Sequence, residues 1–404
     1  MEITIQRLGH KGDGIAEGPI LAPLTLPGET VAGEVADGRM DAPRILTPSP
    51  DRVTAPCRHF RQCGGCALQH ASDDFVARWK QHVVETALAA QGLTTAFRPL
   101  HTSPPHSRRR ATLAGRRTKK GALIGFHARR SDTIVQITDC HVLHPDLMAP
   151  LPALEQITRM GASRSATLAF ALTRSEAGVD CAVTGGKPPD EALRLTLPRF
   201  RDRFARLTWD GETVFTDAPP VQSFGPATVT PPAGAFLQAT PDGEAALLAA
   251  MQEATEGATH IVDLFAGVGT FALPQAQTAP VHAVEGAPEM LAALAHGARH
   301  ASGLKPVTTE ARDLFRRPLT AEDLARFDAA VIDPPRAGAA AQVRELAAAA
   351  ILRIGFVSCN PVPFARDAKT LTGAGYRLDW VQVIDQFRWS PHVELAAQFT
   401  RPHI

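Results

Sequence analysis

No stretch of this chain is long and apolar enough to span a membrane, and Met1–Arg7 has neither the basic nor the apolar segment of a secretory signal. An excess of one charge is also missing, because 42 Lys and Arg residues nearly balance 41 Asp and Glu residues. The overall charge therefore says nothing about a polyanionic partner. The chain has no internal repeat and no low-complexity tract. We expect a soluble, cytoplasmic protein that works without a membrane.

Disulfides are not expected. The six cysteines are unevenly spaced, and a chain of 404 residues can bury a core in each of two or three domains without cross-links. Metal binding better explains Cys57, Cys63 and Cys66, which surround two glycines that permit a tight turn. Cys140 is the best candidate for a fourth ligand. This three-plus-one arrangement favours an iron–sulfur cluster of the 4Fe–4S type over zinc, which more often uses paired C-x2-C motifs and stays an open alternative.

Positive charge is concentrated in one short stretch. Only Asp132 lies nearby to offset it. The stretch could be an ordinary solvated face, but a clustered run of this kind is also typical of a surface that faces RNA. The basic residues are Arg108, Arg109, Arg110, Arg116, Arg117, Lys119, Lys120, Arg129 and Arg130.

Composition and the apolar pattern divide the chain into three domains. Residues 1–50 contain short strands with Gly and Pro between them, a pattern that suits a small β-barrel. Residues 51–72 and 97–222 form a strand-rich central domain with the cysteine cluster. Residues 73–96, which have a helical apolar pattern, are assigned with 223–404 to a third domain.

The C-terminal part alternates strands with Ala-rich helices, after a helix that begins at Thr240 and Pro241. Such alternation predicts an α/β domain with a mostly parallel, doubly wound sheet, and ligands are expected at the carboxyl ends of its strands. The expected strands are His260–Phe265, Val281–Val284, Val307–Glu310, Ala329–Ile332, Ile354–Ser358, Trp380–Ile384 and Glu394–Thr400.

The first of these strands leads into a glycine-rich turn, Asp263–Phe271. Its glycines, Gly267 among them, allow a ligand to approach the backbone, and Glu285 stands where an acidic residue would hold ribose hydroxyls. The third glycine of a dinucleotide fingerprint is missing, so S-adenosylmethionine fits better than a nicotinamide or flavin. Asp313 follows the third strand, where it could meet the adenine, and Asp333 ends the fourth strand before two prolines that stiffen the loop.

A cysteine ends the fifth strand, in Ser358-Cys359-Asn360-Pro361. A lone cysteine in apolar surroundings is often a small buried hydrophobe. At the end of a strand in an α/β enzyme, Cys359 is also well placed to be a nucleophile, because the thiolate is highly nucleophilic.

Taken together, these motifs resemble the RNA uracil-5-methyltransferase family over nearly the whole chain. The motifs are weak individually and specific in this order. The resemblance implies a Rossmann-like class I methyltransferase domain, a β-rich central domain and, in residues 1–50, a shortened TRAM-like barrel. The carrying motifs are Phe236-Leu237-Gln238, Asp263–Phe271, Glu285, Asp333-Pro334-Pro335-Arg336, Ser358–Pro361 and His392-Val393-Glu394.

The resemblance also implies roles for single residues. Cys359 would be the nucleophile and Glu394 the general base. The cysteines Cys57, Cys63, Cys66 and Cys140 look like the iron–sulfur site of the ribosomal-RNA branch, which the transfer-RNA branch lacks. The residues that would bind S-adenosylmethionine are Gln238, Phe265, Gly267, Thr270, Glu285, Asp313 and Asp333; Thr270 stands where relatives often carry Asn.

Methylation at carbon 5 of uracil requires both a nucleophile and a base. Carbon 5 is a poor nucleophile until a thiolate adds to carbon 6, and the proton on carbon 5 must leave before the thiol is expelled. We therefore expect a monomeric enzyme that methylates a uridine flipped out of 23S rRNA. Phe387 and Trp389 could stack on bases but are expected in the core. The alternatives are a tRNA uridine methyltransferase, a cytosine-5 methyltransferase, an iron–sulfur electron carrier and a non-catalytic iron–sulfur protein that binds RNA.

Overall fold

The computed structural model describes residues 1–349 and 351–402. The N-terminal strands pair antiparallel in the order β3-β2-β1-β4-β5. Their core is small and contains Ile5, Val31 and Met40. This arrangement agrees with the short barrel-like β-unit expected from the sequence. The strands are β1 Glu2–Leu8, β2 Gly14–Ala16, β3 Leu21–Ala22, β4 Thr30–Ala32 and β5 Arg44–Thr47.

A second, mostly antiparallel sheet occupies the middle of the chain, in the order β10-β9-β8-β11-β12-β13-β14. Helix α3 (Leu151–Gly161) packs on it, and Trp209 and Phe170 lie in the shared core. The strands are β8 Arg110–Arg117, β9 Ala122–His127, β10 Ile134–Gln136, β11 Thr167–Ser175, β12 Gly178–Thr184, β13 Arg206–Trp209 and β14 Glu212–Thr216. Short helices flank it at α2 Pro145–Met148, α4 Glu191–Thr196 and η1 Leu197–Phe200.

The C-terminal sheet runs in the order β19-β18-β17-β20-β21-β23-β22-β6, with β7 also paired to β22. Most neighbours are parallel, but β23 runs antiparallel between β21 and β22. The strands agree closely with those expected from the sequence. They are β6 Ala96–Phe97, β7 His101–Thr102, β17 Ile261–Leu264, β18 Val281–Glu285, β19 Val307–Ala311, β20 Ala329–Ile332, β21 Arg353–Ser358, β22 Arg377–Asp385 and β23 Leu395–Thr400; the hairpin β15 Gln222–Phe224 and β16 Ala227–Val229 precedes them.

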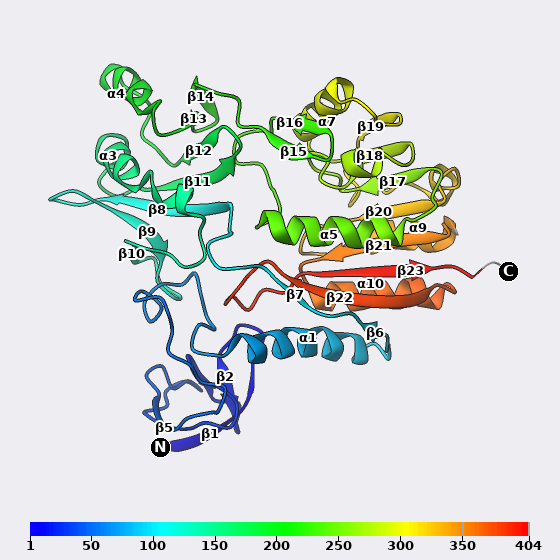
Figure 1. Cartoon of the computed structure of the whole chain (residues 1–404). Coiled ribbons are helices and arrows are strands. Elements are labelled where there is room, and N and C mark those ends of the chain that lie inside the picture. Colours follow the sequence, from blue (N-terminus) through cyan, green and yellow to red (C-terminus); the bar gives the residue numbers. More distant parts are fainter. Residues whose placement is uncertain (350, 403–404) are drawn as a thin grey trace.

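Helices cover both faces of this sheet (Figure 1). Successive strand residues point to opposite faces, so Ala330 and Ile332 pack with α1, α9 and α10, whereas Ala329 and Val331 pack with α5. Such two-sided burial explains why the central strand β20 is apolar throughout. The helices are α1 Asp73–Ala89, α5 Pro241–Ala254, α6 Ala272–Gln275, α7 Pro288–His300, α8 Ala321–Leu324, α9 Ala340–Ala349 and α10 Pro361–Gly373.

The helix starts expected near residues 73 and 241 are confirmed, and side-chain caps account for both. The Thr240 hydroxyl accepts a hydrogen bond from the N–H of Gly243, and Pro241 begins α5. Ser72 caps α1 in the same way. In the described part of the chain, no helix combines the length and the apolar character that a membrane crossing requires.

Candidate active site

Strand order brings Cys359 and Glu394 together at one edge of the C-terminal sheet. In the antiparallel pair β21–β23, the last paired residues are Ser358 and Leu395, so Cys359 and Glu394 stand next to them at the same end of the ladder, close enough for Glu394 to raise the pKa of the Cys359 thiol. Because β23 is antiparallel, its first residues lie beside the carboxyl ends of its neighbours. Asp333 follows β20, whose Ile332 pairs with Phe356 of β21. A thiol and two carboxyls therefore meet at the edge where ligands were expected.

The electrostatics of this group favour neutral side chains. Burial raises the pKa of Glu394 well above its ordinary value, and the nearby Asp333 carboxylate raises it further. Burial likewise raises the pKa of Asp333. The Cys359 thiol has its pKa raised to about 11, chiefly by burial and then by Glu394 and Asp333, against a lowering effect of Arg336. These surroundings therefore favour the protonated forms of Cys359, Asp333 and Glu394.

The loop around Cys359 is held from both sides. The Asn360 side chain caps helix α10 by accepting from the N–H of Val362 at 3.3 Å. Its amide also donates to the carbonyl of Arg336 at 3.1 Å. Asn360 thus ties the cysteine loop to the Asp333–Arg336 loop, which fixes the spacing between the nucleophile and Asp333.

The glycine-rich turn after β17 lies beside Glu285, as expected. The Glu285 carboxylate accepts hydrogen bonds from the N–H of Gly267 at 3.1 Å and from the N–H of Gly286 at 2.7 Å. Gly269 has a φ of +98°, and a Cβ there would come within 2.9 Å of Leu273 and Leu294. Position 269 therefore requires glycine, because its backbone is left-handed and the two leucine side chains pack directly against it.

The remaining residues predicted to bind the methyl donor lie near this turn. Phe265 has a φ of +62°, an uncommon conformation for a residue with a side chain, and its ring lies 5.4 Å from that of Phe315. Asp313 accepts from the N–H of Phe315 at 3.0 Å, so part of its carboxylate already shapes its own loop. Thr270 is half-buried at the start of the helix that follows.

Gln238 reaches the active-site edge from the segment before α5. Its amide donates to Oδ2 of Asp333 at 3.0 Å. A second buried amide there, Gln386, was not predicted from the sequence, and it donates to both Gln238 and Glu394. The sequence did contain one indication of its place. Gln386 comes two residues after the expected strand Trp380–Ile384, and the end of that strand lies at the edge of the sheet that holds the active site.

Phe387 and Trp389 lie on the loop between Gln386 and Glu394. Trp389 is buried, as expected, and its indole N–H donates to Asp73 at 3.1 Å. Phe387 is half-buried and packs edge-on against His392. Trp389 is therefore part of the support of the loop.

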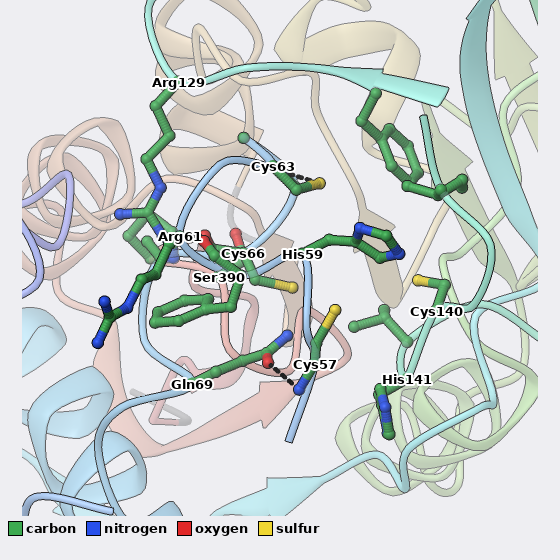
Figure 2. Close-up of a pocket in the computed structure, with 18 of the residues that line it drawn as sticks. Cys57, His59, Arg61, Cys63, Cys66, Gln69, Arg129, Cys140, His141 and Ser390 are labelled. Atoms are coloured by element: carbon green, nitrogen blue, oxygen red, sulfur yellow. Dashed lines mark hydrogen bonds between the residues drawn. The ribbon is translucent and has the colours of Figure 1, made fainter. Parts of the chain in front are cut away.

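The four cysteines predicted to bind metal line one pocket of about 810 Å³ between the N-terminal and central sheets. Figure 2 shows the sulfur atoms of Cys57, Cys63, Cys66 and Cys140 turned toward a common region. The pocket also reaches the active-site loop, since Ser390 to His392 contribute to its lining.

This pocket does not show the predicted metal site. Within residues 1–349 and 351–402, no group of three or more His, Cys, Asp or Glu side chains is gathered in a way that could hold a metal ion. The iron–sulfur cluster therefore stays a prediction.

The RNA-facing interpretation of the basic stretch is wrong for Arg109, which is buried, and stays a prediction for the exposed cations, Arg130 among them. Arg109 is buried in an ion pair with Glu244, and it donates to the carbonyl of Gln238 at 3.0 Å. Arg129 donates to the carbonyl of Cys66 at 2.6 Å, and Arg130 pairs with Asp13. The partners of these arginines in ion pairs and hydrogen bonds come from segments that are distant in the sequence.

Comparison with known proteins identifies the family. The family model described as tRNA (Uracil-5-)-methyltransferase matches residues 232–401. The chain is 44% identical to an RNA methyltransferase of Brucella suis, over 99% of this chain and 98% of the relative. It is 32% identical to the 23S rRNA (uracil(1939)-C(5))-methyltransferase RlmD of Chromohalobacter salexigens, over 99% of this chain and 89% of the relative. The chain belongs to the RNA uracil-5-methyltransferase family.

The fold agrees with this membership. The crystal structure of the Pyrococcus abyssi tRNA (uracil-54, C5)-methyltransferase in complex with S-adenosyl-L-homocysteine superposes with a TM-score of 0.78, at 24% identity and over 99% of both chains. The expected class I methyltransferase fold is therefore confirmed. As a uracil-5-methyltransferase, the chain is an enzyme that uses S-adenosylmethionine to methylate RNA.

Proposed function

We propose that this enzyme methylates carbon 5 of one uridine in 23S rRNA through a covalent adduct between Cys359 and carbon 6. The observation that carries the chemistry is that Cys359 and Glu394 directly adjoin the last residue pair of β21 and β23 and lie close enough to interact electrostatically. The 23S rRNA target is supported by the relative from Chromohalobacter, which matches along 99% of this chain.

The proposed reaction begins when the Cys359 thiol loses its proton and the thiolate adds to carbon 6 of the flipped uracil. Carbon 5 of the resulting enolate would form a bond to the methyl group that S-adenosylmethionine supplies when bound, and the methyl–sulfur bond would break to release S-adenosylhomocysteine. Glu394, as a carboxylate, then takes the proton from carbon 5. The electrons of that C–H bond restore the double bond to carbon 6, and the thiolate leaves.

The methyl donor is proposed to lie along the glycine-rich turn. The Glu285 carboxylate, which accepts from the N–H of Gly267 in this turn, is proposed to take the ribose hydroxyls. The same proposal assigns Gln238, Phe265, Thr270, Asp313 and Asp333 to the donor or to the edge of the uracil. S-adenosylmethionine supplies an electrophilic methyl group when bound.

For the cysteines, we propose that Cys57, Cys63, Cys66 and Cys140 hold an iron–sulfur cluster with a structural role. Four thiolates are a suitable donor set, and the nearby cations Arg108 and Arg129 offset their charge. Anaerobically purified protein should be brown and should contain about four iron atoms per chain. A colourless protein with stoichiometric zinc would instead identify a zinc site.

The target is tested by following labelled methyl groups onto 23S rRNA and tRNA transcripts and mapping the product by mass spectrometry. We expect one 5-methyluridine in 23S rRNA. Methylation confined to tRNA would replace the proposed substrate by the one named in the matching family model.

The chemistry is tested with two variants. Cys359→Ala should form no covalent RNA adduct, and Glu394→Gln should accumulate it, because the proton on carbon 5 can no longer be removed. Undiminished adduct in Cys359→Ala would show that another residue is the nucleophile.

A further inference from the structure

Gln386 is a buried amide whose hydrogen bonds connect several parts of the active site. It directly follows β22, and its side chain is 2% exposed. It lies between Glu394 and Gln238, the residues proposed above as the base and as part of the donor or uracil site.

All hydrogen-bonding groups of this amide have partners. Oε1 accepts from the backbone N–H of Ala239 at 2.7 Å. Nε2 donates to Oε2 of Glu394 at 3.2 Å and to Oε1 of Gln238 at 2.6 Å. A primary amide offers two N–H donors, so both are used here.

The orientation of Gln386 follows from chemistry. A backbone N–H can only donate, so the atom that faces Ala239 must be oxygen and the nitrogen must face Glu394. The same reasoning extends to Gln238. Its oxygen accepts from Gln386, so its nitrogen points to Asp333, at 3.0 Å. One backbone N–H thus orients two amides and, through them, two carboxyls.

We propose that Gln386 is a positioning residue that holds Oε2 of Glu394 as a hydrogen-bond acceptor and leaves Oε1 to take the proton from carbon 5 of the methylated adduct. This inference rests on the proposed role of Glu394. In the step concerned, the C5–H bond breaks, its electrons form the C5–C6 double bond, the C6–S bond breaks, and the proton ends on Oε1.

A donor aimed at Glu394 also has an energetic effect. An N–H bonded to a carboxylate favours the charged form, which burial and the neighbouring Asp333 disfavour. Gln386 therefore helps to make Glu394 a competent base.

Two substitutions separate this role from simple packing. Gln386→Glu keeps an oxygen for the N–H of Ala239 and replaces the two N–H donors by a carboxyl that donates only when protonated, whereas Gln386→Met removes the donors and the acceptor. Gln382→Met is the matched control, because Gln382 lies on the same strand and its amide donates to Pro99, away from the site. Circular dichroism checks that each variant is folded.

The readout is the decay of the covalent RNA adduct in a single turnover, with 5-methyluridine formation measured in parallel. Because general base catalysis contributes about 10²–10⁴-fold, we expect both Gln386 variants to slow adduct decay by about tenfold or more. The rate of adduct formation and the KM for S-adenosylmethionine should change much less. The pH profile of decay should also shift to higher pH, since the carboxylate loses a donor.

The outcomes distinguish the two proposals. If Glu394→Gln accumulates adduct while the adduct of the folded Gln386→Met variant decays at the wild-type rate, the role of Gln386 is refuted. A variant that changes only the KM for S-adenosylmethionine refutes it as well, because Gln386 would then act through Gln238. If Glu394→Gln itself accumulates no adduct, the proposed base is wrong.

Discussion

At the scale of single residues, the proposed nucleophile is protonated in the free enzyme. Burial and two carboxyls raise the pKa of Cys359 to about 11, and Arg336 offsets this only in part. A thiolate must therefore form after RNA changes the environment or displaces water. This differs from enzymes whose cysteine is activated in advance by a neighbouring cation.

Removing a carboxyl should make this thiol more reactive. An ionised Glu394 disfavours the nearby thiolate, so at a pH above the raised pKa of Glu394 the substitution Glu394→Gln should lower the pKa of Cys359 and speed its alkylation by about tenfold. Iodoacetamide labelling followed by mass spectrometry of the Cys359 peptide measures this rate. Glu289→Gln, on the exposed surface of α7, is the control. An equal effect of both variants would exclude a local charge effect.

Asp333 should make stability depend on pH. Its pKa is about 7 in the folded protein against 3.8 ordinarily, so the folded state binds more protons between these values. The raised pKa of Asp333 therefore adds to the free energy of unfolding below about pH 4, and this stabilisation is lost as the pH rises to about 7.

Asp333→Asn should therefore be more stable than the parent protein at about pH 8, by about 1–4 kcal/mol, with little difference near about pH 4. Urea unfolding at the two pH values measures the difference. A parent protein that is more stable than the variant at the higher pH would contradict the sign.

At the scale of elements, helix α1 supports the active-site loop from the far end of the sequence. Lys80 is fully buried on α1, its Nζ lies 2.5 Å from Oδ1 of Asp385, and it donates to the carbonyl of Phe387 at 3.1 Å. Asp73, at the start of α1, binds the side chains of Arg388 and Trp389. The loop that connects Gln386 to Glu394 is therefore anchored at several points.

Lys80→Met should destabilise the protein by about 3–5 kcal/mol, because it leaves the Asp385 carboxylate buried without its cation. The double variant Lys80→Met, Asp385→Asn should recover part of that loss. Arg78→Ala on the same helix is the control, since its pairing with Asp51 is exposed and worth about 0–1 kcal/mol. Chemical unfolding measures the free energy of unfolding of each variant. Equal losses for Lys80→Met and Arg78→Ala would show that the buried Lys80–Asp385 pair stabilises the protein no more than an exposed pair does.

At the scale of the whole molecule, the positive charge available to RNA is smaller than the sequence suggested. Arg109, Arg129 and Arg130 have protein partners, whereas Arg117, Lys119 and Lys120 remain exposed where β8 turns into β9. This hairpin extends from the edge of the molecule, across from α7 (Figure 1).

Replacing these three exposed cations with Ala should weaken RNA binding and make it less dependent on salt. The slope of log K against log salt should fall by about one for each phosphate that is no longer neutralised. Filter binding at several salt concentrations measures the slope. Arg299→Ala on α7 is the control. If the hairpin variant keeps the slope of the parent protein, RNA binds elsewhere.

The strands and much of the sheet edge could be predicted from the sequence alone. Apolar runs locate the central strands β17, β20 and β21 closely, because both faces of these strands are buried. The same pattern places Asp333 and Cys359 at strand ends, where α/β proteins bind ligands. The roles of these residues, and the cluster at Cys57 to Cys140, remain predictions.

Which side chains meet became visible only in three dimensions. Gln386 bonds to Gln238 across 148 positions, and Lys80 bonds to Asp385 across 305. Arg109 likewise finds Glu244, which removes it from the surface. Local patterns report which face of an element is buried, but they carry no information about the partner. Partners are set by strand order and by the antiparallel insertion of β23, which brings Glu394 back to Cys359.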